Sequence, residues 1–551
     1  MAHGEMVSRR SMLGGLVALA GAAGVGGLAG CSTPESPGGT SSTGGGGGGT
    51  GLTLPALVPY ADVKPDLDGD ASGVPQGFFS YPATPARREG FPLTGIAPVS
   101  GFFQANKDMA PRDANPWWQG IEAGIGTRFD ASTISSTVYT EKYQTMMAGN
   151  DLPDLMQMVP VAKFPALLDA KFADLTPHLS GDAVKDYPGL ASIPTNTWKL
   201  AVVGGKIRGV AQPRPAGGRV VSYRGDLWAA MGIDQTPELK NGEDFLALCR
   251  QVSDPAKNVF AMGAAPTNWA LYVVLEMMGA PNTWAEEGGK FTHIYEAPQM
   301  KDALEVVKQM MTDKILHPES VSQPANNIVW WTAGTTSMYI QDFAGWPLYA
   351  RTYPDWKLGA LTLPKWDGGG NAVKHLGNPG YSAFVAIKKA DDKRVADLLR
   401  VLDYVASPFG TQQYLDMNFG AAGVDYNLVK GNPVTTKDYD KHWPQGLQYA
   451  GAQAFAALYN PTDSDQVKSQ HAWLSALMPT GVANASQGLY SEAAVGSGAV
   501  AARALTDVQT AIIQGARPVS DYDEALKQWQ TTSGNQQRTE LEAALQQQGG
   551  R

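Results

Sequence analysis

Apolar residues recur at two alternating spacings from about residue 91 to the C-terminus. Short apolar runs of strand length, such as 96–103 and 155–159, alternate with stretches whose apolar residues fall three or four positions apart. The first pattern is typical of strands and the second of a helix with one buried face. Because alternating strands and helices favour parallel pairing, the body is predicted to be α/β with mostly parallel, wound sheets.

Several helices are predicted together with their starting points. Asn115 and Pro116 supply an N-cap and a first-turn proline for a helix with apolar positions at Trp117, Ile121 and Ile125. These apolar stripes indicate core packing, and none of them indicates a cofactor. The same spacing predicts further helices at 141–148, 300–315, 395–405, 501–512 and 522–529.

The N-terminal segment lacks this periodicity and has the order of an export signal. Arg9 and Arg10 precede an uncharged stretch rich in Gly, Ala and Leu that ends at Leu28-Ala29-Gly30-Cys31. A positive segment, an apolar segment and small residues before a cysteine are typical of a twin-arginine lipoprotein signal peptide. Residues 1–30 are therefore predicted to be that signal, and Cys31 the lipidated residue on the extracytoplasmic face of the cell membrane. The alternative, a membrane-spanning anchor, predicts the same location.

Residues 31–90 are predicted to be a flexible tether followed by a Pro-rich arm. Residues 32–51 are almost wholly Ser, Thr, Pro and Gly, with an unbroken glycine run at 44–49. Such a composition cannot bury enough apolar surface to fold, so it behaves as a flexible coil. From Leu52 to about Gly90 prolines are frequent and periodicity is weak, which predicts an extended arm able to lie on the body.

Composition changes this picture mainly by excluding functions. The 551 residues are 43% apolar, which is enough for a large core divided into two or three domains. The formal charge of −9 is spread along the chain, whereas nucleic-acid binding needs a concentrated Lys and Arg face, so nucleic acid is not an expected partner. Cys31 and Cys249 do not make a disulfide framework, and Cys249 within an apolar helix is predicted to be a packing residue.

Short motifs occur along the chain in the order found in one protein family. From about residue 95 to 548 the set resembles the carbohydrate-type extracellular solute-binding lipoproteins of ABC importers, in particular their large oligosaccharide-binding branch. The motifs are Gly149-Asn150-Asp151-Leu152-Pro153-Asp154, Gly204–Val210, Tyr223–Ile233, Glu243–Phe245, Ser253–Pro255, Gly420–Tyr426 and Gly515–Trp529.

The resemblance implies a two-lobed periplasmic-binding-protein-like fold of type II, an α/β fold in which a multi-strand hinge joins the lobes around a ligand cleft. It implies a carbohydrate ligand and ABC transporter permease subunits as partners, and a monomer is expected. Residues 254–260 supply too few carboxylates for the about six to eight oxygen ligands of Ca²⁺, so no calcium is expected at that site. No other metal and no cofactor is expected. Lobe 1 is placed at 91–212 and 382–450, and lobe 2 at 213–381 and 451–551.

Candidate ligand-binding residues are aromatic and polar side chains near predicted strand ends and hinge crossings. Sugar rings stack on aromatic faces, and sugar hydroxyls need hydrogen-bonding groups. Gln341–Trp346 follows a predicted strand at 338–340, at the carboxyl edge where open α/β sheets bind ligands. The segments 212–218 and 378–381 are candidate hinge crossings. The candidate residues are Trp346, Asp342, Phe343, Trp269, Asn268, Arg214, Tyr381, Trp117 and Asn106.

The predicted function is capture of a neutral oligosaccharide or related polyhydroxyl solute, and alternatives stay open. An acidic oligosaccharide would need several Arg or Lys in the cleft, and only Arg214 and Arg219 are near the predicted hinge. A secreted glycosidase would need two cleft carboxylates, and a sensory or adhesion lipoprotein would need no permease. The chain carries no nucleophile-elbow or P-loop motif, so it is not expected to be an enzyme. For Trp346 and Trp269, ordinary core packing is the alternative role.

Overall fold

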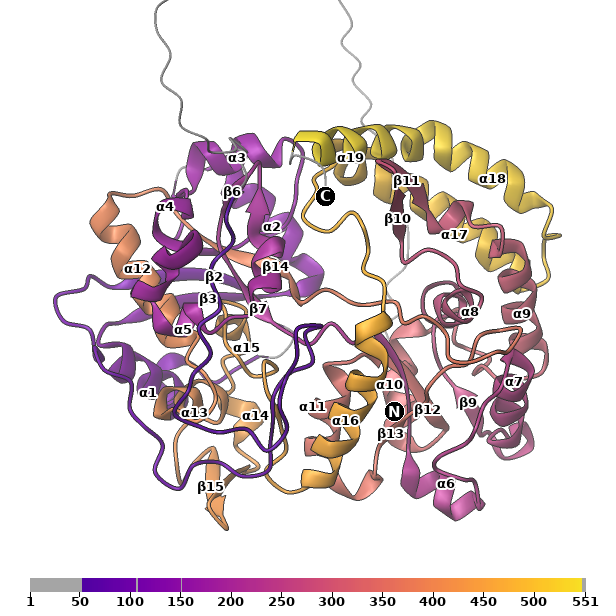
Figure 1. Cartoon of the computed structure of the whole chain (residues 1–551), viewed down its shortest axis with the longest axis horizontal. Helices are drawn as coiled ribbons and strands as arrows, with labels where there is room; N and C mark the ends of the chain where they lie inside the picture. Colours follow the sequence, from indigo (N-terminus) through magenta and orange to yellow (C-terminus); the bar gives the residue numbers. More distant parts are fainter. Residues whose placement is uncertain (1–51, 106–107, 150, 548–551) are drawn as a thin grey trace, which may run out of the picture. The chain divides into compact units, whose positions relative to one another are not determined.

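The computed structural model describes residues 52–105, 108–149 and 151–547, and these residues form two α/β lobes, drawn in Figure 1. Two of the predicted functional residues, Cys31 and Asn106, lie outside the described residues. Within the described ranges, no helix is long and apolar enough to cross a membrane.

The first lobe is built on a five-stranded sheet with the order β3-β2-β4-β14-β7. Its two faces bury different apolar clusters, because successive strand side chains point to opposite faces. Phe103 packs with α1 and α12, and its neighbour Phe102 packs with α2. The strands are β2 (Val99–Ala105), β3 (Phe129–Ser135), β4 (Leu155–Gln157), β7 (Val210–Pro213) and β14 (Gly380–Ile387), and the helices are α1 (Pro116–Ile125), α2 (Ser136–Ala148) and α12 (Asp392–Val405).

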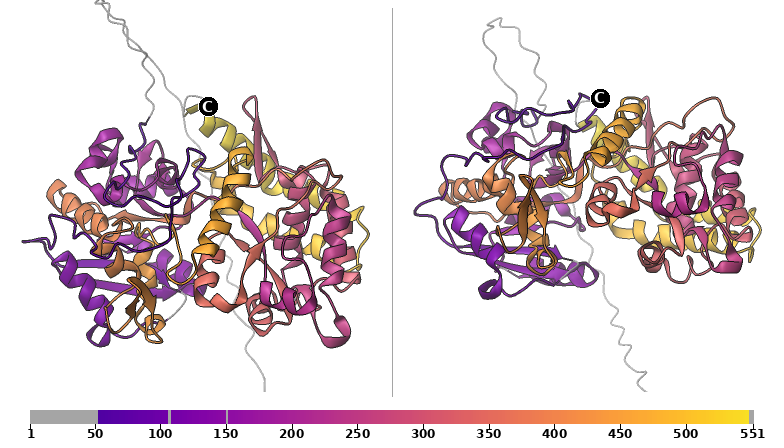
Figure 2. Two further views of the ribbon diagram at one scale, coloured as in Figure 1. Left: turned by 60° about the horizontal axis from the view of Figure 1, so that its bottom comes forward. Right: turned by 90° about the horizontal axis from the view of Figure 1, so that it is seen from below.

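The second lobe is built on a four-stranded sheet with the order β13-β8-β12-β9. One large apolar cluster joins this sheet to the helices at the C-terminal end of the chain, drawn in yellow in Figure 2. The strands are β8 (Arg219–Tyr223), β9 (Phe260–Met262), β12 (Thr336–Asp342) and β13 (Gly359–Ala360). The helices of this cluster are α7 (Gly242–Gln251), α8 (Leu271–Met277), α9 (Met300–Thr312), α17 (Ala499–Ile513), α18 (Asp521–Trp529) and α19 (Asn535–Gln547).

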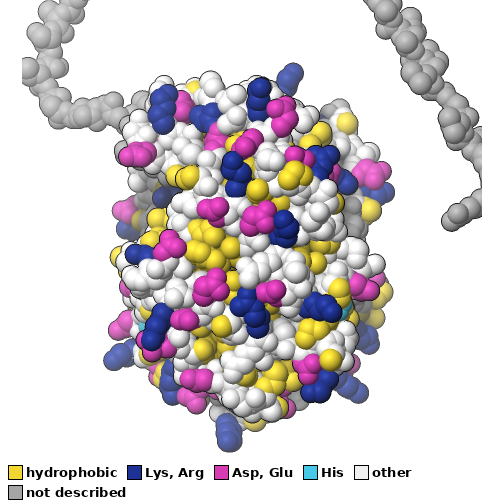
Figure 3. Space-filling model, turned by 90° about the vertical axis from the view of Figure 1, so that its right-hand side faces the viewer, with side chains coloured by type: hydrophobic (Ala, Val, Ile, Leu, Met, Phe, Trp, Pro, Cys, Tyr) yellow, Lys and Arg dark blue, Asp and Glu magenta, His cyan; other side chains and the backbone are white. Residues whose placement is uncertain are grey.

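A second cluster of this lobe packs α10 (Asn327–Ala333), α11 (Gly345–Thr352) and α16 (Ser464–Leu477) against β8 and β12. Because α16 follows the last strand of the fold, β17 (Leu458–Tyr459), the chain returns to the second lobe at this point. The face of the molecule in Figure 3 carries Lys, Arg, Asp and Glu intermixed, without a concentrated basic patch.

The predicted helices are confirmed to within a few residues. The Asn115 side chain accepts a hydrogen bond of 3.0 Å from the Trp118 backbone N–H, which is the N-cap contact expected at the start of α1. Cys249 is fully buried within α7, and burial raises the pKa of its thiol. It is therefore a packing residue, as predicted.

The prediction of mostly parallel sheets is wrong. In the two lobe sheets, β2 pairs in parallel with β3 and β4, and β12 pairs in parallel with β9. The pairings of β14 with β4 and β7, and of β8 with β12 and β13, are antiparallel. The antiparallel strands adjoin the segments that pass between the lobes, because a chain that returns from the other lobe enters the sheet in the opposite direction.

The segments that join the lobes run side by side and are referred to as the hinge crossings: 214–218, 374–379, 449–463 and 481–488. The Arg214 backbone N–H donates to the Pro379 carbonyl at 3.2 Å, and the Gly377 N–H donates to the Ala216 carbonyl at 3.0 Å. The Leu376 N–H donates to the Val482 carbonyl at 2.9 Å. Both segments predicted from the sequence, 212–218 and 378–381, lie in this layer.

Candidate functional site

A cavity of 320 Å³ lies beside the hinge crossings at the carboxyl end of β12. Its charged lining consists of two arginines and one carboxylate, Arg214, Arg219 and Asp342. Amide side chains supply hydrogen-bonding groups from several hinge crossings and from the second lobe. They are Asn282, Asn378, Asn484 and Gln487.

Aromatic rings surround one of the arginines at the edge of this cavity. The Arg214 guanidinium carbon lies 4.8 Å from the Tyr381 ring centroid and 5.3 Å from that of Phe455. Tyr381 stacks on Tyr449 with centroids 4.3 Å apart and an interplanar angle of 17°. The Tyr381 hydroxyl donates to Gln104 Oε1 at 3.3 Å. These five residues, the floor cluster, bring together β2, β14 and two hinge crossings.

The floor cluster keeps its arginine charged but poorly solvated. Burial lowers the pKa of the Arg214 guanidinium, although a guanidinium remains protonated at neutral pH. Its Nε and one Nη donate to Gln212 Oε1 at 3.2 and 3.0 Å, which satisfies these donors without neutralising the charge. Burial also raises the pKa of the neighbouring Tyr449 to about 12, so that phenol is neutral. Within the described ranges, Arg214 forms no ion pair.

Arg219 begins β8 on the second-lobe side of the cavity. Its guanidinium lies over Tyr272 and Trp269, 4.5 and 5.6 Å from their ring centroids. Its Nε is buried without a hydrogen-bond partner, and no ion pair forms with its side chain among the described residues. Asp342 is its cross-strand partner on β12 and is exposed. The cavity therefore holds two guanidinium groups against one carboxylate.

A buried ion pair supports Arg219 from behind. Lys374 Nζ donates to the Arg219 backbone carbonyl at 2.6 Å and to Glu276 Oε1 at 2.7 Å. The side chains of this pair are only 4% and 3% exposed. Lys374 and Glu276 therefore neutralise each other, and Glu276 does not neutralise the arginines of the cavity. Burial lowers the pKa of the adjacent His375, whose Nε2 lies 2.8 Å from the Ala280 carbonyl oxygen. The imidazole is therefore neutral near pH 7.

This arrangement is suited to holding an anion and hydroxyl groups. Asp342 is the one carboxylic acid among the described residues that line the cavity, whereas a glycosidase uses two carboxyl groups across the bond it cleaves. In the described part of the chain, no group of three or more His, Cys, Asp or Glu side chains could hold a metal ion.

The structure brings some of the sequence-predicted site residues together and separates others. Arg214, Tyr381, Asp342 and Phe343 all line the cavity, although the Phe343 side chain is 1% exposed. Trp269 stands behind Arg219 and is partly buried in the core of the second lobe. Asn268 is exposed but does not line the cavity.

Trp346 is a correction to the predicted site. Gly345 begins α11, and the indole of the next residue packs into the cluster with α16, where it is 2% exposed. Its Nε1 donates to Gln466 Oε1 at 3.2 Å, and Trp473 meets it edge-on with centroids 6.2 Å apart. No face of this ring is open to a sugar, so the packing alternative describes it.

Trp117 is a second correction. It is 1% exposed, its Nε1 donates to the Asp416 carbonyl at 2.6 Å, and it contacts Tyr439 at a centroid distance of 5.0 Å. Its position at the start of α1 puts it on the same face as Ile121 and Ile125, which is the face that packs into the first lobe.

Sequence reasoning missed part of the site. Tyr449 and Phe455 belong to a hinge crossing that no strand or turn signal marked, and the Lys374–Glu276 pair joins positions 98 residues apart. Of these missed features, only the role of Arg219 had a signal in the sequence, because this residue directly follows the predicted crossing at 212–218.

Comparisons with known proteins agree with this fold. No protein-family model matches the chain. The polygalacturonan/rhamnogalacturonan-binding protein YtcQ of Bacillus subtilis (strain 168) is 22% identical over 437 residues, covering 78% of this chain and 87% of that protein. The lipoprotein LipO of the same organism is 21% identical over 459 residues, covering 79% of this chain and 90% of that protein.

Solved structures show the same two-lobed fold. A solute-binding protein described as HMO-binding and ABC-transporter-associated, from Bifidobacterium longum infantis, superposes with a TM-score of 0.62 at 9% identity, covering 83% of this chain and all (100%) of that one. The alginate-binding protein AlgQ2 superposes with a TM-score of 0.58 at 15% identity, covering 84% of this chain and 100% of that one. The chain thus has the type II fold of ABC-importer solute-binding proteins.

Proposed function

We propose that this solute-binding protein of an ABC importer captures an oligosaccharide that carries carboxylate groups, in the cavity beside its hinge. The observation that carries the proposal is the pair Arg214 and Arg219. Both guanidinium groups border one cavity, and among the described residues neither forms an ion pair, Asp342 being the one carboxylate in the lining. A partly desolvated cation without a counter-ion is stabilised by an anionic ligand, and an arginine can hold a carboxylate with two parallel hydrogen bonds.

The similar proteins support the same ligand class. The relative from Bacillus subtilis is named for binding polygalacturonan and rhamnogalacturonan, and a protein of the same fold is named for binding alginate. Sugars of these types carry a carboxylate on the ring. A neutral oligosaccharide, the ligand first expected from the sequence, leaves both guanidinium groups unpaired and is the competing outcome.

The remaining lining residues suit the uncharged parts of such a ligand. Asn378 and Asn484 can donate to ring hydroxyls, and Asn282 Oδ1 can accept from them, because Asn282 Nδ2 already donates to the Leu376 and Val482 carbonyls. The exposed part of Tyr381 offers apolar surface in the cavity. The cavity volume of 320 Å³ lies near the lower end of small-molecule sites, ~300–1,000 Å³, so a longer chain extends beyond it.

The proposed setting is the outer face of the cell membrane. Cys31 follows a lipoprotein-type signal in the sequence, and one relative is itself named a lipoprotein. A monomer anchored there would present captured sugar to the permease subunits of its importer. Replacement of Cys31 by Ala should abolish incorporation of a labelled fatty acid, and undiminished labelling would contradict the anchor.

The test of the ligand class compares two ligands that differ only in their carboxylates. Trigalacturonate and its carboxyl-reduced counterpart, a neutral trisaccharide, are titrated into the purified protein by isothermal calorimetry. The charged ligand should bind at least ~30-fold more tightly, corresponding to about 2 kcal/mol. Arg128→Gln removes an arginine that pairs with Asp130 on the surface, outside the cavity, and this control variant should keep the preference for the charged ligand. Equal affinities would point to a neutral ligand, and binding of neither would contradict the proposal.

The proposal also states that the ligand is bound without being cleaved. The single carboxyl group in the described lining supports this statement. After prolonged incubation, chromatography should recover trigalacturonate unchanged. Protein-dependent cleavage over many turnovers, lost in Asp342→Asn, would favour the glycosidase.

A further inference from the structure

The N-terminal arm, residues 52–93, contacts both lobes in turn. Its first part lies on the first lobe, where the Ala56 N–H donates to the Gly181 carbonyl at 3.0 Å and the Val58 N–H to the Ala191 carbonyl at 2.8 Å. Leu52 and Leu54 pack on the main cluster of that lobe. Figure 1 draws this segment in indigo.

The middle of the arm is attached to the second lobe. Val74, 3% exposed, and Leu67 pack into the cluster that contains α11 and α16. His471 Nε2 of α16 lies 2.8 Å from the Asp68 carbonyl oxygen. The short strand β1 (Gly77–Phe78) then pairs in parallel with β17, part of a hinge crossing.

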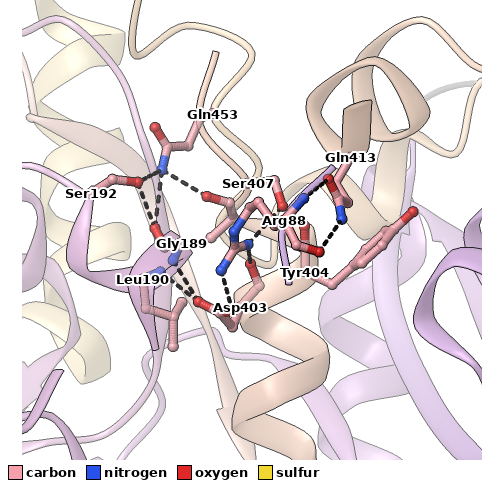
Figure 4. Close-up of polar contacts among 10 residues, drawn as sticks. Arg88, Gly189, Leu190, Ser192, Asp403, Tyr404, Ser407, Gln413 and Gln453 are labelled. Carbon is pink, nitrogen blue, oxygen red and sulfur yellow. Dashed lines mark hydrogen bonds and ion pairs between the residues drawn. The ribbon is translucent and has the colours of Figure 1, made fainter. Parts of the chain in front are cut away.

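The last part of the arm returns to the first lobe and is held there by a buried ion pair. Arg88 Nη2 contacts Asp403 Oδ2 at 2.5 Å, with side chains 8% and 6% exposed. Arg88 Nη1 donates to the Asp403 carbonyl and to Ser407 Oγ at 2.7 and 2.8 Å. The Arg88 backbone and the Gln413 amide exchange two hydrogen bonds, as Figure 4 shows.

The same network reaches a hinge crossing. Asp403 Oδ1 accepts from the Gly189 and Leu190 N–H groups at 2.6 and 3.1 Å. Gln453, in the crossing 449–463, donates to the Gly189 carbonyl at 3.2 Å and to Ser192 Oγ at 2.7 Å. Figure 4 shows these contacts converging on the segment that carries Gly189. The arm is therefore anchored at the base of a hinge crossing.

Between its anchors the arm stands off from the hinge. A cavity of 630 Å³ separates arm residues 57–78 from the hinge crossings and from the segment 192–199 of the first lobe. Arg214, Pro215 and Gly377 line both this cavity and the ligand cavity. The hinge layer thus lies between the two cavities, and the arm lies on the side opposite the ligand.

We propose that the arm is a strap behind the hinge that holds the ligand cleft open, and that ligand-driven closure has to stretch it. A rotation that closes the lobes on one side of a hinge separates the points on the other side. Since the arm joins the lobes on that other side, its contacts oppose closure and lower the population of the closed state. The inference rests on the proposed capture of ligand between the lobes.

Three variants test this strap. The release variant, Leu67→Ser with Val74→Ser, removes the attachment to the second lobe and leaves the Arg88 anchor in place. Leu52→Ser with Leu54→Ser is the matched control, because it loosens the same arm where it contacts only the first lobe. A third variant inserts Gly-Gly-Ser-Gly between Lys64 and Pro65 and again between Val74 and Pro75. The two insertions lengthen both passages of the arm between the lobes, from Val63 on the first lobe to Leu67 and from Val74 back to Phe78, without removing an apolar contact.

The readout is the distance between the lobes in the ligand-free full chain carrying Cys31→Ser. Fluorescent labels are placed at Glu141→Cys in α2 and Asn268→Cys beyond β9, both exposed positions, while Cys249 is buried. The release and insertion variants should shift the energy-transfer distribution to shorter distances, and the control should match the parent protein. The same variants should bind trigalacturonate up to about tenfold more tightly, because closing the lobes then costs less of the binding free energy.

Outcomes separate the strap from the proposed ligand. An unchanged distance distribution in the insertion variant, a shift to longer distances, or the same shift in the control would each overturn the strap. If the release variant does not fold, the insertion variant tests the strap without it. If the protein binds no sugar but its variants show the predicted distance shift, the ligand proposal is contradicted and the strap is supported.

Discussion

Two aromatic clusters of the second lobe and hinge have similar sequence contexts and different environments. Trp346 and Phe343 follow the end of β12, and Tyr381 and Arg214 lie at the predicted hinge crossings. In the first cluster every ring faces another ring, and the one polar indole atom is bonded within the protein to Gln466. In the floor cluster the Tyr381 and Phe455 rings are partly exposed, and they surround a cation that forms no ion pair in the described ranges.

The contrast between the two clusters shows which property identifies a binding surface. Position at a strand end places a residue near the cleft edge but does not decide which way its side chain packs. A cluster whose hydrogen-bonding and charged groups are all satisfied internally gains nothing from a ligand. A cluster that holds an uncompensated guanidinium gains both a counter-ion and apolar contact. Substitutions in the two clusters should therefore have different effects on stability and on binding.

Trp346→Ala should lose more stability than any other variant proposed for these two clusters. Truncating a fully buried tryptophan should lower the free energy of unfolding by ~3–5 kcal/mol, because a cavity replaces its contacts. Urea denaturation measures this change, and calorimetry on the folded fraction should find normal affinity for trigalacturonate. Near-normal stability with lost binding would restore Trp346 to the ligand site.

The next effect is the loss of affinity in Arg214→Gln and, separately, in Arg219→Gln. Each should weaken trigalacturonate binding about 30-fold, or ~2 kcal/mol, because a buried charge pair is lost. The neutral trisaccharide should be affected much less. If both ligands lose affinity equally, the arginines act through the shape of the cavity and not through their charge.

The sequence predicted the larger part of this fold for physical reasons that are local. Apolar spacing located α1, α9, α12, α17 and α18, and the Asn115 cap located a helix start, because these signals lie within one element. The sheet directions could not be predicted in this way, since β7 and β14 pair only after the chain has crossed to the other lobe and returned.

The candidate site was predictable only where it coincides with a crossing. Arg214 and Tyr381 lie in Pro- and Gly-containing segments that mark the hinge, so they were found. Tyr449 reaches Tyr381 across 68 positions of sequence, 449 − 381, and no local pattern reports such a contact. Trp346 was misplaced because the start of α11 one residue earlier turns its ring towards α16.

A smaller effect is expected when the Tyr381 ring is removed. Tyr381→Leu takes away the ring between Arg214 and Tyr449, and a cation–π contact of this kind contributes ~0.5–1 kcal/mol. Affinity for trigalacturonate should fall by about two- to fivefold, measured by calorimetry. Tyr353→Leu is the control, since this tyrosine stacks on Trp356 outside the cavity. Equal losses in both variants would remove the floor cluster from the site.

The smallest effect is the dependence of binding on salt. Raising ionic strength from about 0.05 to 0.5 M shortens the screening length and should weaken trigalacturonate binding by a few-fold, with no change for the neutral trisaccharide. Fluorescence titration at several salt concentrations measures both. A salt response of the neutral ligand would show that the protein itself changes with salt.

Calorimetry on the double variant Arg214→Gln, Arg219→Gln tests most directly whether these two arginines bind the ligand carboxylates. The parent protein should prefer trigalacturonate to its carboxyl-reduced counterpart by ~30-fold or more, and the double variant should bind the two with nearly equal, weak affinity. An unchanged melting temperature would show that the fold is intact. A double variant that keeps the full preference for the charged ligand would contradict the claim that these two arginines read its carboxylates.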